Sequence, residues 1–206
     1  MTVFLERLLI IPVLGVMLAG GIIMVASRRV VRIGALACQY VFVTWLTLSF
    51  LPLSFASIRL LTGLITAAML YLSSHTMDEQ QPGQDRVESM TGRGFRTIAY
   101  GVVIVAGYGV FSSRWFVVSG LEDMVLLGAI FLVASGLLQI GISKQTFAIG
   151  VGLITLLSGF ELLYTFLEPS RAMLALQAAV HLALALVISY LDVLIPGSRE
   201  EGKPAE

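Results

Sequence analysis

The chain has 206 residues, of which 57% are hydrophobic and 13% are charged, and its mean hydropathy is +0.93. Thirteen basic and thirteen acidic side chains give a formal net charge of zero, so the composition gives no support to a nucleic-acid-binding protein. The single cysteine, Cys38, excludes an internal disulfide and a Cys/His metal cluster.

The charged residues are concentrated in short stretches between long apolar runs. A bilayer core about 30 Å thick needs about 20 helical residues, and the sequence offers about seven such runs. The runs are continuous and lack the alternation of a membrane β-barrel. The sequence therefore predicts an all-α polytopic integral membrane protein with about seven transmembrane helices.

The apolar runs set the predicted helix boundaries. In chain order the predicted helices cover residues 4–26, 33–51, 57–72, 97–111, 121–142, 146–167 and 172–195. We expect the first helix to be retained and not cleaved as a signal peptide, because an arginine cluster follows a run long enough to span. The chain is predicted to have five segments. They are a three-helix unit (1–74), a polar cytoplasmic loop (75–96), a linking helix (97–120), a second three-helix unit (121–195) and a flexible cytoplasmic tail (196–206).

The positive-inside rule predicts the orientation. Of the 13 Lys and Arg residues, nine fall on the side that holds the loops after helices one, three and five and the C-terminus, and four fall on the other side. We therefore expect the N-terminus outside and the C-terminus in the cytoplasm.

A weak internal repeat is visible at an offset of 116 residues. At this offset Gly20 aligns with Gly136, and Arg28 aligns with Lys144. The alignment suggests a three-plus-one-plus-three arrangement of helices, a kind of parallel repeat that occurs in transporters. Chance matches among glycines and isoleucines in apolar helices are the alternative explanation.

The residue that most needs an explanation is Glu161, a carboxylate inside the sixth predicted helix. An ionisable group within a bilayer is costly and is a functional candidate by default. Ser158, Tyr164 and Thr165 lie three or four residues away on the same helix and form a polar stripe beside it. Glu161 is a candidate proton-relay group, and the alternative is a protonated carboxyl that only links neighbouring helices.

His181 is the candidate partner of Glu161. It lies in the last predicted helix, with Gln177 one turn earlier. Counted from the turn between the two helices, Glu161 and His181 lie at depths of about 10 and about 15 Å. Because consecutive helices are antiparallel, we expect the two side chains within one or two water molecules of each other. Imidazole changes protonation near neutral pH and suits a relay, whereas a core histidine bonded to Gln177 is the structural alternative.

Five other residues receive structural interpretations. Arg59 lies near the outer end of the third helix and is expected to extend to the membrane interface. Gln39 and Gln139 are expected to bridge helices, Asp192 to be hydrated near the cytoplasmic end, and Trp45 to pack between helices.

Residues 121–195 resemble the small three-helix K-type subunit of respiratory complex I. The resemblance rests on the apolar run 126–138, the turn 143–145, the segment Gly159-Phe160-Glu161-Leu162-Leu163 and the alanine-rich last helix. In that family a Gly-x-Glu-Leu segment supplies a membrane carboxylate of the proton path, which Glu161 matches. His181 lies roughly where the family has a second carboxylate. The seven-helix length is similar to that of the E component of formate-hydrogenlyase-type membrane hydrogenases.

The resemblance implies a membrane-arm subunit in which Glu161, and His181 with it, pass protons laterally between antiporter-like and hydrogenase-like or complex I-like subunits. We expect a bacterial or archaeal cytoplasmic membrane, no cofactor and no metal. No motif of a phosphate-binding loop, a zinc helix or a nucleophile elbow is present, so a self-contained enzyme is not expected. Two alternatives stay open, a structural or assembly subunit and a small independent transporter.

Overall fold

The computed structural model describes residues 2–80, 90–113 and 122–194, and their side chains over 8–74, 92–113 and 122–192. The described residues form seven α-helices and no strand. Their bounds are α1 (Thr2–Val25), α2 (Arg29–Leu48), α3 (Leu53–Gln80), α4 (Met90–Ser112), α5 (Asp123–Ile142), α6 (Thr146–Leu167) and α7 (Arg171–Leu194). All seven are long and apolar enough to cross a membrane, which confirms the predicted all-α class and helix number for the described residues. The orientation of the termini stays a prediction.

Two helices extend further than the hydropathy predicted. α3 continues to Gln80 instead of residue 72, and α4 begins at Met90 instead of residue 97, so both ends of the predicted polar loop are helical. The apolar run marks only the part of a helix suited to lipid, and a helix once formed continues through residues such as Met, Glu and Gln that favour it. Three segments lie outside the described residues: the middle of that loop (81–89), the segment between α4 and α5 (114–121) and the tail (195–206).

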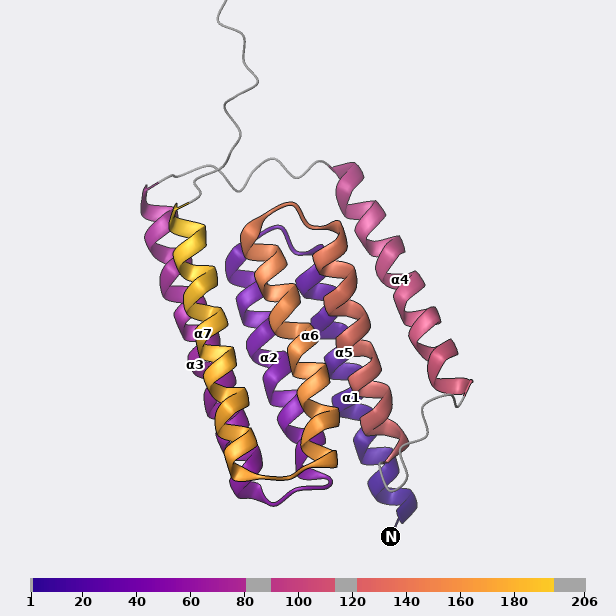
Figure 1. The fold of residues 1–206 in the computed structure, drawn as a ribbon. Helices are drawn as coiled ribbons and strands as arrows, with labels where there is room; N and C mark the ends of the chain where they lie inside the picture. The colour runs from indigo at the N-terminus through magenta and orange to yellow at the C-terminus, as the bar shows by residue number, and fades with distance from the viewer. Residues whose placement is uncertain (1, 81–89, 114–121, 195–206) are drawn as a thin grey trace, which may run out of the picture.

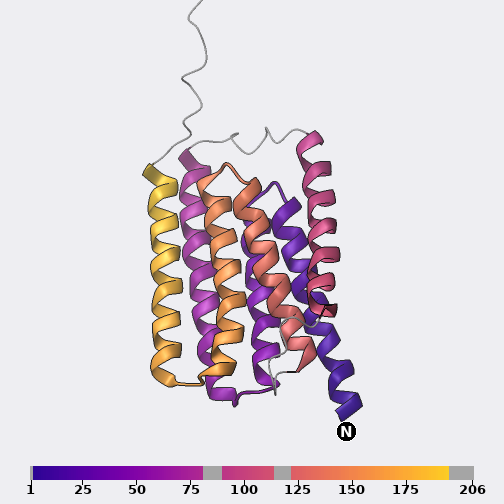
Figure 2. The same cartoon turned by 45° about the vertical axis from the view of Figure 1, so that its right-hand side comes forward.

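Six helices form two layers that face each other. α1, α2 and α3 make one layer and α5, α6 and α7 make the other, with α1 beside α5 and α3 beside α7 (Figure 1). α4 lies outside both layers, next to α5 and α1 (Figures 1 and 2). This arrangement puts the interior of the protein between the layers.

The two layers match in helix position as well as in direction. An offset of 116 residues maps the end of α1 onto residue 141, and α5 ends at 142. The same offset maps the start of α2 onto residue 145 and the start of α3 onto residue 169, and α6 and α7 start at 146 and 171. The helix boundaries thus agree with the three-plus-one-plus-three arrangement suggested by the sequence offset.

Glycines hold α5 and α6 unusually close together. A Cβ atom at Gly136 would lie 2.5 Å from the backbone nitrogen of Leu156 and 2.7 Å from the carbonyl oxygen of Gly152. A Cβ at Gly159 would lie 2.9 Å from the backbone nitrogen of Val133. The two backbones are therefore in direct contact, as glycines permit between membrane helices, and α6 is fixed where its buried polar residues face α2, α3 and α7.

Candidate functional site: a buried carboxylate between an imidazole and a guanidinium

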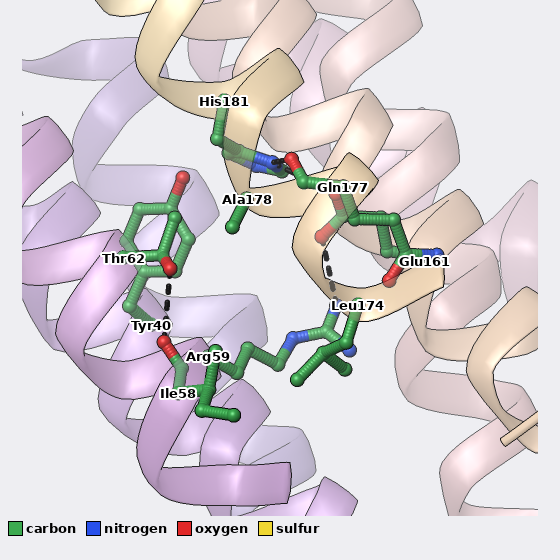
Figure 3. A pocket seen from close by; sticks show the side chains of 9 residues that line it. All are labelled: Tyr40, Ile58, Arg59, Thr62, Glu161, Leu174, Gln177, Ala178 and His181. Carbon is green, nitrogen blue, oxygen red and sulfur yellow. Dashed lines mark hydrogen bonds and ion pairs between the residues drawn. The ribbon is translucent and has the colours of Figure 1, made fainter. Parts of the chain in front are cut away.

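Three ionisable side chains from three helices meet between the layers. Glu161 of α6 lies between His181 of α7 and Arg59 of α3 (Figure 3). The Nδ1 atom of His181 is 2.8 Å from Oε1 of Glu161, and Nη2 of Arg59 is 3.5 Å from Oε2. Glu161 is 5% exposed, His181 is 1% exposed and Arg59 is 6% exposed. Charged groups buried to this extent need partners, and each here has one.

The meeting of Glu161 and His181 follows from local chain geometry. α6 ends at Leu167 and α7 begins at Arg171, so a short turn makes the two helices antiparallel neighbours. Similar depths below that turn then bring the side chains to one level, as the sequence predicted. The structure places them in direct contact, closer than the one or two water molecules expected.

The position of Arg59 corrects the sequence interpretation. Its side chain does not extend to the interface but turns inward, where Nη2 donates a hydrogen bond of 2.8 Å to the carbonyl oxygen of Ser158. The cause is the pairing of α3 with α7, which puts this face of α3 against the interior. A signal was present in the sequence, because Arg59, Thr66 and Ser73 recur every seven residues and mark one polar face of the helix.

Three of the four predicted supporting residues lie at the site. Ser158 Oγ is 3.4 Å from Nε2 of His181, and the carbonyl oxygen of Gln177 is 3.3 Å from Nδ1. Thr165 donates a hydrogen bond of 3.2 Å to Oε1 of Gln177 and so steadies that residue. Tyr164 is the exception, since its hydroxyl donates to Glu168 at the exposed end of α6.

The ring of Tyr40, from α2, was not anticipated at this site. Its centroid is 5.8 Å from that of His181, with the planes at 68°, and the residue is 3% exposed. Ser158 and Thr66 are the polar neighbours of its hydroxyl, but neither makes a well-aligned hydrogen bond with it. Nothing in an apolar helix distinguishes such a tyrosine from a packing residue, so only the packing of α2 between its neighbours reveals it.

A small pocket reaches the ionisable cluster. It is lined by residues of α2, α3, α6 and α7, and its volume of about 20 Å³ is enough for about one water molecule. Three lining atoms, Oη of Tyr40, Nε of Arg59 and Oε1 of Glu161, are buried without a well-aligned hydrogen bond among the described residues. Buried polar atoms of this kind are normally satisfied by ordered water. The geometry therefore suits a hydrated, not a dry, cluster.

The hydrogen bonds accommodate both protonation states of His181. A carbonyl oxygen only accepts, so the contact with Gln177 assigns a proton to Nδ1. The Ser158 hydroxyl, which donates to the carbonyl oxygen of Ile154 at 2.9 Å, can then accept from a protonated Nε2. If Nε2 is neutral, the same hydroxyl can rotate and donate to it. With Arg59 balancing Glu161, gain of a proton changes the charge of the site while both ring nitrogens of His181 keep a neighbouring partner.

Three residues outside this cluster test other predictions. Gln139 bridges α5 and α6 as expected, donating a bond of 3.0 Å to the carbonyl oxygen of Ala148. Asp192, expected to be hydrated, is instead buried at 8% exposure, and its Oδ2 is 2.5 Å from Nη1 of Arg29 on α2. Trp45 is 36% exposed and lies on the outer side of α2, because the face with Tyr40, Val43 and Thr47 is the buried one.

Gln39 was also expected to bridge helices, and it is buried at 2% exposure. Its Oε1 atom has no hydrogen-bond partner among the described residues.

Comparison of the chain with protein-family models, curated proteins and solved structures finds no match.

Proposed function

We propose that this chain is a membrane-arm subunit of a complex I-like or hydrogenase-like respiratory assembly in a bacterial or archaeal cytoplasmic membrane, and that Glu161 and His181 pass protons within it. One observation carries the proposal. A buried carboxylate lies 2.8 Å from a buried imidazole, and both are connected to a pocket of about the size of one water molecule.

The arrangement supports proton exchange in three ways. Proton transfer needs donor and acceptor atoms within hydrogen-bond reach, which Glu161 and His181 satisfy. The imidazole has partners in both protonation states, through Gln177 and Ser158. Arg59 compensates the charge of the carboxylate, so the site can hold Glu161 as an ionised proton acceptor beside the imidazole.

The subunit assignment rests on the resemblance of residues 121–195 to the K-type subunit, in which Glu161 matches the membrane carboxylate. Lateral transfer would place antiporter-like and hydrogenase-like or complex I-like subunits on the outer faces of the two layers. The described helices have many large apolar side chains there, for example Leu72 of α3 and Leu186 of α7, which are 67% and 59% exposed. Such faces suit lipid and partner helices alike.

The first prediction concerns the carboxylate itself. In E161Q, the amide oxygen can still accept hydrogen bonds but the side chain cannot take up a proton, so proton movement should fall by about tenfold or more. Proton uptake is measured in sealed membranes that contain the assembled complex and is normalised to folded protein. E168Q is the matched control, because Glu168 is an exposed carboxylate at the end of the same helix. Unchanged coupling and turnover in E161Q would exclude the relay.

A small independent transporter is the second candidate. Two matching three-helix layers enclose the pocket, and transporters commonly bind their substrate where structural repeats meet. This candidate requires the purified chain alone to move protons or another ion in liposomes. It also requires that the chain purifies in mild detergent without companions, whereas antiporter-like companions would support the respiratory subunit.

A structural or assembly role is the remaining alternative and makes an opposite pair of predictions. If the cluster only joins helices, E161A should reduce the amount of assembled complex because it removes the contacts to Arg59 and His181. E161Q should then assemble better than E161A, since its amide oxygen can still accept hydrogen bonds although it leaves the charge of Arg59 uncompensated.

A further inference from the structure

The pocket approaches the cluster along the line where α3 and α7 meet. Ile58 and Thr62 of α3 and Leu174 and Ala178 of α7 line its approach, and Glu161 and His181 lie at its inner end (Figure 3). Ile58 is five residues from the start of α3, and Leu174 is three residues from the start of α7. At the helical rise, these positions are within about 8 Å of the helix ends. The pocket therefore belongs to the side of the protein where both helices begin.

The other half of the interior is mostly apolar, although Oε1 of Gln39 and Oγ of Ser189 are buried there without a hydrogen-bond partner among the described residues. Leu36, Leu70, Ile154 and Ile188 belong to one buried cluster of α2, α3, α6 and α7, and each is at most 4% exposed. Ala185, one turn beyond His181 on α7, is fully buried. Dense packing of these side chains opposes a continuous chain of water molecules on this side.

A polar contact closes the far end of the same interior. Arg29 at the start of α2 pairs with Asp192 near the end of α7, and its guanidinium lies 5.4 Å from the centre of the Phe147 ring. This contact ties α2, α6 and α7 together on the side opposite the pocket. The site therefore has a small pocket on one side, and a mostly apolar layer followed by an ion pair on the other.

We propose that water and protons reach Glu161 and His181 from one side of the membrane only, along the α3–α7 line, in the conformation described here. That protons are the species transferred rests on the proposed function. The one-sided access rests only on the position of the pocket and the packing of the other half. The positive-inside prediction makes the accessible side the outer one.

Three alanines on α7 provide a matched test by cysteine labelling. Ala178 lines the pocket, Ala179 is exposed on the outer surface of the bundle, and Ala185 is fully buried in the apolar layer. Each is replaced by cysteine in a C38A background, because the native Cys38 is exposed. A thiol reacts as its thiolate, which forms in contact with water and not in lipid or an apolar core.

The experiment uses the full chain in sealed right-side-out and inside-out vesicles with a charged, membrane-impermeant methanethiosulfonate. A178C should react at least about tenfold faster than A179C and A185C when the reagent is on the pocket side, a difference of the order expected from thiolate availability. With the reagent on the opposite side, all three should be unreactive. Equal rates for A178C and A179C, or reaction of A178C or A185C from the opposite side, would overturn one-sided access.

Adding E161Q to the A178C chain separates this inference from the proposed function. One-sided labelling with unchanged proton movement means that access is as described but Glu161 is not the relay. Loss of proton movement together with labelling from both sides means that the relay stands and one-sided access is wrong.

Discussion

Replacing Arg59 with methionine should lower the free energy of unfolding by about 3 to 5 kcal/mol, because it leaves the Glu161 carboxylate buried without a compensating charge. Methionine keeps most of the packing volume, so the loss reports the charge and the hydrogen bond to the Ser158 carbonyl oxygen. For a chain of this length, the melting temperature in detergent should fall by roughly 10 °C.

A double variant identifies the cause of that loss. R59M/E161Q removes both charges, and replacing both members of a buried ion pair is often neutral for stability. Its melting temperature should therefore recover most of the loss seen in R59M. R171M is the matched control, because Arg171 is an exposed arginine at the start of α7. If R59M/E161Q is as unstable as R59M, the uncompensated carboxylate is not the cause.

The same double variant sharpens the functional proposal. It restores the charge balance of the site but has no carboxylate to exchange protons, so its proton movement should be as low as that of E161Q. Recovery of stability without recovery of proton movement separates the role of Glu161 in the fold from its role in the relay. Recovery of both would support the structural alternative.

The helices and the contact between Glu161 and His181 could be predicted because both depend on short-range information. A membrane helix satisfies its own backbone hydrogen bonds, so its length and hydropathy are enough to identify it. Glu161 and His181 lie on consecutive helices joined by a short turn, and counting residues from that turn fixes their relative depth.

The missed parts of the site depend on which helices become neighbours across the layers. Arg59 is 102 positions before Glu161 in sequence, and Arg29 is 163 positions from Asp192. Hydropathy places Arg29, Arg59 and Asp192 near helix ends, where a hydrated position is the ordinary expectation. Only the pairing of α3 with α7, and of α2 with the layer opposite, turns them inward. Tyr40 was missed for the same reason.

The second large effect should come from a single methyl group at Gly136. In G136A the new Cβ would lie 2.5 Å from the Leu156 nitrogen, a backbone atom that cannot rotate away, so α5 and α6 must separate. Overpacking of this kind costs about 1 to 3 kcal/mol or more, and here it would also shift the helix that carries Glu161.

G141A is the control on the same helix, because a Cβ at Gly141 meets nothing within 4 Å and alanine favours the helix by about 0.5 to 1 kcal/mol. Thermal melts in detergent should therefore show G136A well below the wild type and G141A at or above it, and equal melting temperatures for the two variants would mean that the backbones are not in contact at Gly136.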